Sequence, residues 1–305
     1  GWDIKRILGT VPVEEDGSVI FKAPANTPIS IQPLDKDGVA IQWMRSWVTG
    51  QPGEVVSCIG CHEDQNQIAI PKRVIASQKA PSALTLPEGG IRSFTFDLEV
   101  QPILDRACIA CHNGEGKAFD LRGGKKDKLG YGTSYLNLHP YVHRQGGEGD
   151  MVVLQPYEYH PNTSELVHLL KKGHHNVKLT DKEWKTLYNW IDYNAPDKGY
   201  FDANVLTDLP YKGFDQIKRR KELTDKYANG AGVDWKKEIA DYADYLKKQG
   251  PITPVMPEKA ASVKEKNVKA KGWPFGADRI KEMLAKEPET RKEVEIAPGV
   301  KVNFV

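Results

Sequence analysis

The chain has 305 residues, of which 39% are hydrophobic and 28% charged, enough for two or three domains that each bury a core. Its 43 basic and 41 acidic side chains leave a net charge of +2, too balanced for nucleic acid or an anionic membrane to be the main partner. No apolar run approaches the roughly 18 residues that a membrane helix needs, so we predict no membrane span.

The first 57 residues predict a small β-sandwich. Short apolar runs alternate with turn dipeptides such as Asp16-Gly17 and Asp37-Gly38, which supply the backbone angles that chain reversals require. The last of these runs leads directly into a Cys-x-x-Cys-His unit. We assign residues 1–66 to this domain. Residues 67–92, which are rich in Pro, Ser, Ala and Gly, are predicted to form an extended connector.

An all-helical domain is predicted over residues 93–199. Its first helix leads into a second Cys-x-x-Cys-His unit, and we expect Asp97 to cap that helix. The apolar positions of this helix recur at intervals of three and four residues. They are Val100, Ile103, Leu104 and Ala107.

Two further helices are predicted near the end of this domain. Gly173 is expected to end the first of them, because glycine adopts the left-handed backbone angles common at helix ends. Thr180 and Glu183 form a capping box at the start of the second. Residues 200–305 shift toward Lys, Glu and Asp and predict a helical segment and a linker, with helices near 214–227 and 235–248. The predicted fold class is therefore α+β and multidomain.

All four cysteines of the chain lie in the two Cys-x-x-Cys-His units. In c-type haem attachment, two thioethers hold the porphyrin and the adjacent imidazole binds the iron, which explains every residue of the unit. We therefore predict two covalently bound haem c groups. The residues that bind them are Cys58, Cys61, His62, Cys108, Cys111 and His112.

Two other interpretations of the cysteines are open. Four thiolates from two Cys-x-x-Cys pairs can form a tetrahedral zinc site, which would make the chain a zinc-stabilised interaction module. Two disulfides are also possible, as in redox motifs. Neither interpretation gives a reason for the histidine that follows each second cysteine, so we favour haem.

The second haem has a candidate for its opposite axial ligand in the loop before the capping box. His174 follows Gly173 directly, and no methionine lies there, so we favour His174 over its neighbour His175. Both histidines can also be solvated loop residues. His168 lies inside the preceding helix and is expected to be a satisfied surface or core histidine.

The first haem lacks an obvious second ligand, because residues 1–57 contain no histidine. Met44 is a candidate, but the flanking Trp43 and Trp47 favour a place in the core. The remaining candidates lie in the helical domain. They are His139, His143 and His160. The other possibility is an open iron, which is typical of catalytic or gas-binding haems.

Four segments resemble the C-terminal diheme half of the hydrazine synthase alpha-subunit family, over about residues 5–200. They read GTVPVEEDGSVIFKAPANTPISIQPLDKDG, QPGEVVSCIGCHE, VQPILDRACIACHNG and TSELVHLLKKGHHNVKLTDKEWKTLYNWIDYNAP. The resemblance implies a β-rich domain with the first haem and a helical cytochrome c domain with a bis-histidine second haem. It also implies a catalytic tyrosine a few residues after the first unit. Here His62 is followed by Glu, Asp, Gln, Asn and Gln, so we do not expect hydrazine synthesis itself.

The end of the chain carries a second, shorter resemblance. The stretch GWPFGADRIKEMLAKEPETRKEVEIAPGVKVNFV is similar to the linker and opening strand that precede a formylglycine-generating domain. The first residues carry no pattern of a secretion signal. We therefore expect this chain to be part of a larger polypeptide.

The function predicted from these patterns is electron transfer by a diheme c-type cytochrome module. The alternative is a haem enzyme, in which an open first iron acts on a small nitrogen or oxygen species and the second haem supplies electrons. Covalent haem attachment implies a periplasmic or extracellular location in a bacterium. The sequence does not identify the redox partner protein.

Overall fold

The computed structural model describes residues 5–44, 46–59, 73–115, 118–128, 130–144, 156–199, 216–227, 233–256, 292–297 and 300–304. Backbone contacts divide the chain into two units, residues 1–262 and residues 263–305. The first unit contains both cysteine-bearing segments, and the described part of the second is a β-hairpin.

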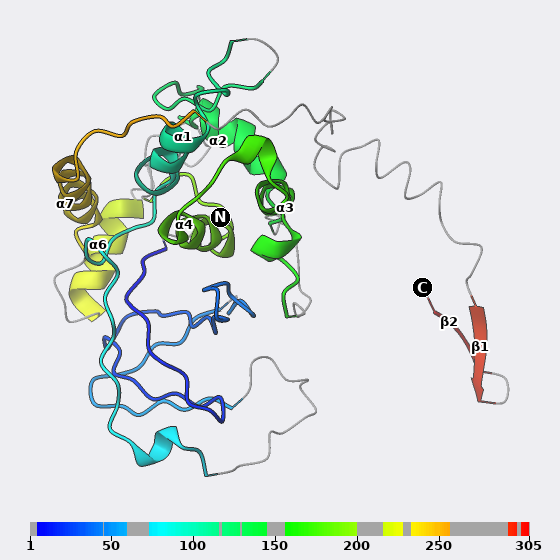
Figure 1. Cartoon of the computed structure of the whole chain (residues 1–305). Helices are drawn as coiled ribbons and strands as arrows, with labels where there is room; N and C mark the ends of the chain where they lie inside the picture. Colours follow the sequence, from blue (N-terminus) through cyan, green and yellow to red (C-terminus); the bar gives the residue numbers. More distant parts are fainter. Residues whose placement is uncertain are drawn as a thin grey trace. The chain divides into compact units, whose positions relative to one another are not determined.

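Short helices make up the regular structure described in the first unit (Figure 1). Its α-helices are α1 (Gln101–Ala107), α2 (Thr133–Leu138), α3 (Glu165–Lys171), α4 (Asp181–Asp192), α6 (Gln216–Tyr227) and α7 (Trp235–Lys248). Single helical turns lie between them: η1 (Ala76–Gln78), η2 (Phe96–Val100), η3 (His139–Tyr141), η4 (Pro161–Thr163) and η5 (His174–Asn176). The two helices predicted near 214–227 and 235–248 are confirmed as α6 and α7.

The β-sandwich predicted for the N-terminal region is wrong. In the described part of residues 5–59 no strand forms, and the chain makes only isolated bridges. Thr10 and Phe21 bridge to Thr85 and Ser82, within the segment that the sequence assigns to the connector, and Arg6 bridges to Ser93 just after it. This region is therefore an irregular, extended segment, not a sheet.

Prolines within the apolar runs explain why these runs do not assemble into sheets. Proline has no N–H to donate to a ladder, so it is confined to strand ends, edges and bulges. Pro12 and Pro33 lie inside two of the expected strands. The run around Thr10 accordingly bonds to its partner at a single position, where Thr10 and Thr85 exchange backbone hydrogen bonds of 3.0 and 2.9 Å.

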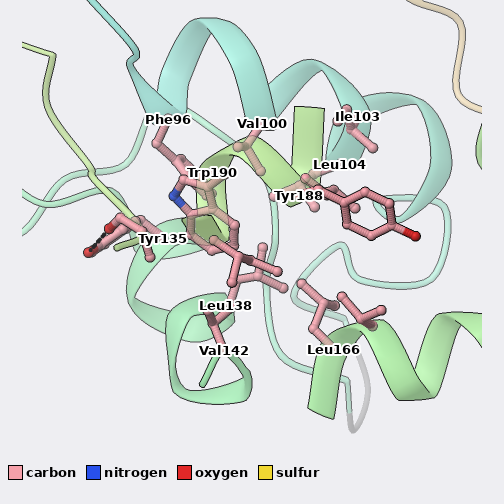
Figure 2. Close-up of a cluster of buried hydrophobic side chains, with 14 of the residues drawn as sticks. Phe96, Val100, Ile103, Leu104, Tyr135, Leu138, Val142, Leu166, Tyr188 and Trp190 are labelled. Atoms are coloured by element: carbon pink, nitrogen blue, oxygen red, sulfur yellow. Dashed lines mark hydrogen bonds between the residues drawn. The ribbon is translucent and has the colours of Figure 1, made fainter. Parts of the chain in front are cut away.

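The hydrophobic core of the first unit is built by η2, α1, α2, α3 and α4 (Figure 2). Phe96 and Trp190 are fully buried with their ring centres 5.3 Å apart, and Tyr135 meets Phe96 edge-on at the same distance. The apolar face predicted for the first helix is confirmed, because all four of its residues are buried. They are Val100, Ile103, Leu104 and Ala107.

Thr95, and not Asp97, caps this helical stretch. The Thr95 hydroxyl accepts a hydrogen bond from the Leu98 N–H at 3.2 Å. Asp97 lies inside the first turn, and its carboxylate pairs with Lys126 at 3.1 Å. Thr and Asp are both good N-cap residues, so the residue types alone do not show which of the two caps the helix.

The end of α3 and the start of α4 lie where the sequence predicts them. Gly173, with a φ of 94°, follows the end of α3. Across the start of α4, the Glu183 N–H donates to the Thr180 hydroxyl at 3.3 Å and the Thr180 N–H donates to the Glu183 carboxylate at 2.7 Å. The predicted helix end and capping box are confirmed. Together they fix both ends of the loop 173–180, which carries His174.

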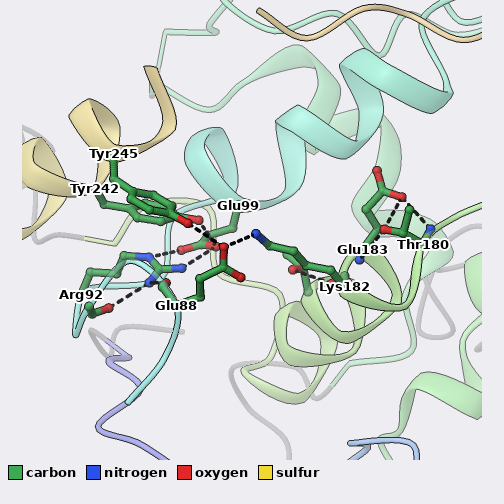
Figure 3. Close-up of polar contacts among 10 residues, drawn as sticks. Glu88, Arg92, Glu99, Thr180, Lys182, Glu183, Tyr242 and Tyr245 are labelled. Atoms are coloured by element: carbon green, nitrogen blue, oxygen red, sulfur yellow. Dashed lines mark hydrogen bonds and ion pairs between the residues drawn. The ribbon is translucent and has the colours of Figure 1, made fainter. Parts of the chain in front are cut away.

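A buried ion pair docks α7 onto the helical core (Figure 3). Arg92 donates to the Glu99 carboxylate at 2.7 and 3.1 Å, and the Tyr242 hydroxyl donates to the same carboxylate at 3.2 Å. The guanidinium carbon of Arg92 also lies 3.4 Å from the centre of the Tyr242 ring. A Cβ at Gly89 would lie 2.8 Å from that ring, so only glycine allows this close approach.

The described part of residues 263–305 is an antiparallel hairpin, formed by β1 (Lys292–Ala297) and β2 (Val300–Phe304). Lys292 pairs with Phe304, and the register shifts between Glu295 and Ala297. Among the helices that the structure describes in the whole chain, none has the length and apolar character needed to cross a membrane.

Candidate cofactor site at the second Cys-x-x-Cys-His unit

The second Cys-x-x-Cys-His unit continues directly from α1. Cys108 is the C-cap of this helix, and its N–H donates to the Leu104 carbonyl at 2.8 Å. The N–H groups of Cys111 and His112 both donate to the Cys108 carbonyl, at 3.1 and 2.9 Å. The helix therefore fixes the backbone of the unit, with both thiols and the imidazole within about one turn.

The two thiols of this unit differ in their surroundings. Cys108 packs against the core, and burial raises the pKa of its thiol to about 12, whereas Cys111 is exposed. Reactive cysteines of redox motifs have lowered pKa values, typically at a helix N-terminus. Cys108 stands at a helix C-terminus, where the helix dipole disfavours a thiolate. This environment does not suit a thiol–disulfide redox motif.

The imidazole of His112 is oriented by a main-chain group. Its Nδ1 lies 3.1 Å from the carbonyl oxygen of Phe119. Because a carbonyl only accepts, we assign the ring proton to Nδ1, which leaves the lone pair on Nε2. Burial lowers the pKa of His112, and the nearby His175 lowers it further. A neutral imidazole held in this way is the form that binds a metal ion.

The ring of His174 faces that of His112. Their centres are 6.1 Å apart, and the planes meet at 41°. An imidazole nitrogen binds a first-row metal at about 2.0 Å, so two imidazoles on opposite sides of one ion have ring centres about 6 Å apart. His174 is half-buried, while His175 is exposed and meets His174 edge-on at 4.5 Å. Of the two neighbours, it is His174 whose ring lies next to that of His112, at a separation that a metal ion held between the two imidazoles would allow.

Aromatic side chains lie beside His112. The Phe119 ring lies 4.7 Å from that of His112 and stacks on Tyr141 at 5.5 Å. Other partly buried apolar side chains pack against the outside of the core. They include Cys108, Leu136, Leu170, Leu179 and Trp184. Apolar surfaces, an imidazole pair and two adjacent thiols are the donor set and surroundings that a c-type haem requires, so these residues fit that group.

The first Cys-x-x-Cys-His unit is described only in part. Cys58 is an exposed free thiol, and the whole stretch from Glu54 to Ile59 is exposed. Cys61 and His62 lie outside the described residues. The structure therefore shows the approach to this unit but not its second thiol or its imidazole.

Two of the histidines considered for the first haem have their Nδ1 atoms engaged. His139 Nδ1 donates to the Tyr135 carbonyl at 3.2 Å, and the two rings stack at 5.1 Å. His143 Nδ1 lies 2.8 Å from the hydroxyl of Thr163, whose own proton is directed at main-chain carbonyls. We therefore assign the proton to Nδ1 in both rings, which leaves Nε2 as the atom that can bind a metal.

His160 is set in a different way. It is buried and caps η4, where its Nδ1 accepts the Asn162 N–H at 3.0 Å. The proton of its neutral ring must then lie on Nε2, which is buried without a hydrogen-bond partner. His160 would have to give up its cap before that nitrogen could bind iron.

The tryptophans on either side of Met44 do not share one environment. Trp43 is buried with Ala40 and packs against Tyr159, whose ring lies 4.7 Å from that of His143. Trp47, in contrast, is exposed, and Met44 is half-buried. Only one of the two tryptophans therefore belongs to the core, and His143 lies on the side of the helical region that contacts the N-terminal segment.

Asp192 joins the N-terminal segment to α4, a role that sequence reasoning missed. Its carboxylate accepts the Ala40 N–H at 2.9 Å and the indole N–H of Trp43 at 3.5 Å. Burial, with a smaller contribution from Asp35, raises the pKa of Asp192 to about 7. No sequence signal marks this residue, because a polar residue at the end of a helix is ordinary. The Phe119 carbonyl was missed for a related reason, since any residue type supplies that group.

The zinc interpretation is only partly accessible to the structure. Among the residues that it describes, no three His, Cys, Asp or Glu side chains are grouped to hold a metal ion. A four-thiolate site needs Cys61, which lies outside them.

Comparison with known proteins gives one result. Residues 1–63 match the family model of the hydrazine synthase alpha subunit middle domain. No curated protein and no solved structure matches the chain at a significant level. The likeness to hydrazine synthase is therefore supported for residues 1–63, in a domain described as the middle one. The match ends just after the first Cys-x-x-Cys-His unit, so the wider resemblance over about residues 5–200 stays a prediction.

Proposed function

We propose that this chain is an electron-transfer module with two covalently bound haem c groups. The family match over residues 1–63 supports a link to hydrazine synthase-related proteins but carries no information on activity. The residues proposed to attach the haems and bind their iron atoms are Cys58, Cys61, His62, Cys108, Cys111, His112 and His174.

One observation carries the proposal, the facing imidazoles of His112 and His174 at 6.1 Å. A bound haem would supply a one-electron Fe(III)/Fe(II) couple at this point. His112 and His174 would together hold that iron, and no position would be left on it for a substrate. A site of this kind suits electron transfer better than catalysis.

The residues around the pair have defined tasks in this proposal. The Phe119 carbonyl accepts the Nδ1–H of His112, which fixes the ring and makes Nε2 a stronger donor. The rings of Phe119 and Tyr141 exclude water from one side of His112, and such burial is one of the factors that set a reduction potential. Gly173, at a left-handed φ, turns the chain so that His174 faces the unit.

Covalent attachment is the first property to test. The protein, made in a host with c-type haem maturation, should retain two haems per chain through acid-acetone extraction, as read by mass. Replacing Cys108 and Cys111 together with Ala should remove one haem, and replacing Cys58 and Cys61 should remove the other. Stoichiometric zinc without haem, or haem that extracts freely, contradicts the proposal and supports the interaction-module interpretation.

The axial pair is tested by His174→Ala. In the wild type the second haem should be low-spin in both oxidation states. The variant should become high-spin and bind carbon monoxide, because one axial position opens. His175→Ala is the matched control, since His175 is adjacent but exposed, and it should keep the low-spin spectrum. A low-spin spectrum that survives His174→Ala shows that another residue is the ligand.

For the first haem we propose His143 as the second axial ligand. Its Nε2 is the available nitrogen, and its ring lies beside Tyr159, which packs on Trp43 of the N-terminal segment. The reduced wild type should then bind no carbon monoxide, His143→Ala should bind one, and His139→Ala should bind none. Rapid binding of one carbon monoxide by the wild type would instead indicate an open iron and favour an enzyme.

The proposal extends to the location and the partner of the chain. Covalent haem is attached on the outer side of the bacterial inner membrane, so we place the protein in the periplasm or outside the cell. Its partner would be another redox protein that exchanges single electrons. Fractionation of the native host with a haem stain tests the location, and haem confined to the cytoplasmic fraction contradicts it.

A further inference from the structure

Large apolar side chains are exposed next to Cys58. Val55, Val56 and Ile59 have exposed fractions of 88%, 46% and 62%, and that of Trp47 is 67%. Single exposed apolar residues are ordinary on a protein surface. Four of them within one short stretch are not, because burying each would contribute about 1.5–3 kcal/mol. Something outside the described contacts is therefore expected to cover them.

The two arms that carry these side chains lie side by side. A turn connects them, in which the Glu54 N–H donates to the Gln51 carbonyl at 3.1 Å. A Cβ at Gly50 would lie 3.6 Å from the side chain of Val56, which places the first arm against the second. We define the Cys58 apolar surface as Trp47, Val55, Val56 and Ile59.

We propose that the Cys58 apolar surface is the contact surface of the haem attached at Cys58, an inference that rests on the proposed function. The thiol that would form the thioether is exposed in the same stretch. An extended chain advances at most about 3.6 Å per residue, so Val55 lies within about 11 Å of Cys58. A porphyrin tethered at Cys58 is apolar on both faces and has a comparable width. Its attachment brings an apolar partner to this surface without any other molecule.

The second Cys-x-x-Cys-His unit provides the contrast that supports this inference. There, apolar side chains such as Phe119 and Tyr141 already pack against the core beside His112. Around Cys58 the apolar side chains face solvent. The first haem would thus be covered by a surface that is completed only when the haem is attached.

The test introduces one negative charge on this surface. In the full-length protein with both haems, Val55→Asp should place a carboxylate near the first iron and stabilise its oxidised form, shifting its reduction equilibrium by about tenfold. Val13→Asp is the matched control, because Val13 is 56% exposed but is outside the surface, and it should shift either haem less than twofold. Spectroelectrochemical titration measures both, and His174→Ala identifies the second haem.

A second variant reads the contact through fluorescence. Trp47→Phe should remove a share of the emission of the haem-free protein but almost none from the haem-loaded protein, because a haem close to Trp47 quenches it. The results distinguish a failure of the proposed function, in which no haem is attached, from a failure of this inference, in which haem is attached but does not contact the surface. Peptide mass that shows no haem on Cys58 overturns the proposed function. If haem is attached to Cys58 and the reduction potential is unchanged in Val55→Asp, the inference alone is overturned. It is also overturned if the wild type is a dimer that Val55→Asp dissociates without a change in potential, because a second copy then covers the surface.

Discussion

The two Cys-x-x-Cys-His units share a sequence pattern but stand in regions built in opposite ways. The second Cys-x-x-Cys-His unit follows a buried helix, and its His112 is held by the Phe119 carbonyl and lies next to His174. Cys58 of the first unit is exposed in a segment that is held by isolated bridges. The same short motif therefore stands in one packed and one exposed setting, because the surrounding chain and not the motif decides how its side chains are held.

This difference has an energetic meaning. A site whose side chains are already ordered loses little conformational freedom when it binds a ligand. An exposed site must order its side chains when it binds, and at the first Cys-x-x-Cys-His unit the proposed covalent bond to haem would offset that cost. We expect substitutions around the second Cys-x-x-Cys-His unit to be more destabilising than substitutions around the first.

The largest test of this comparison replaces one leucine in each region. Leu104→Ala, in α1 next to Cys108, should lower the free energy of unfolding by about 2–5 kcal/mol, because Leu104 is 3% exposed and its removal leaves a cavity. Leu34→Ala should cost under about 1 kcal/mol, since Leu34 is 39% exposed. Urea unfolding followed by circular dichroism measures both. Equal losses would show that the N-terminal segment is as tightly packed as the helical core.

A second test concerns the joint between the regions. The pKa of Asp192 is raised to about 7 in the folded protein, against about 3.9 in an unfolded chain. Between these pH values the folded state binds the extra proton, so stability should fall as pH rises from about 4 to 7, by roughly 4 kcal/mol, and stay lower above pH 7.

Asp192→Asn should remove that slope while it keeps an oxygen that can accept the Ala40 N–H. The urea midpoints of both proteins at pH 5 and pH 8 give the measurement. Burial also raises the pKa of Asp197, to about 6, but that contribution has the same sign in both proteins and cancels in their difference. Parallel pH profiles would mean that Asp192 is not buried at this joint.

The smallest test addresses the loop that carries His174. Thr180→Ala removes the side-chain half of the capping box and should cost about 1 kcal/mol of stability. Thr180→Ser keeps the hydroxyl and should cost less. In haem-loaded protein the Ala variant should also broaden the signals of the second haem and leave those of the first unchanged. Broadening of both sets would mean that the two regions are not organised independently.

The parts of the fold that could be predicted from sequence are those set by local signals. Thr180 and Glu183 form their capping box with each other, and Gly173 ends its helix through its own backbone freedom. The apolar stripe of the first helix also needs no information beyond its own spacing. Each of these features depends on residues within about one helical turn, so the sequence alone contains the cause.

The parts that could not be predicted depend on distant partners. The run around Thr10 was expected to pair with its neighbouring strands, yet it bridges to Thr85, and no local signal distinguishes the two outcomes. At the candidate site, the cysteines and His112 are marked by their motif, whereas the Phe119 carbonyl and the Asp192 carboxylate are placed only by tertiary packing. His174 stands between these cases, because its loop was predictable and its ring orientation was not.

The docking of α7 determines where this protein can be shortened. The Arg92 and Glu99 side chains are only 11% and 6% exposed, and Tyr242 of α7 covers them. A fragment that stopped at residue 199 would open this ion pair to water, where such pairs contribute about 0–1 kcal/mol. It would also lose the Val255 N–H that donates to the Arg106 carbonyl at 2.7 Å, two residues before Cys108. A fragment that keeps the second Cys-x-x-Cys-His unit in its native setting must therefore include α7 and Val255.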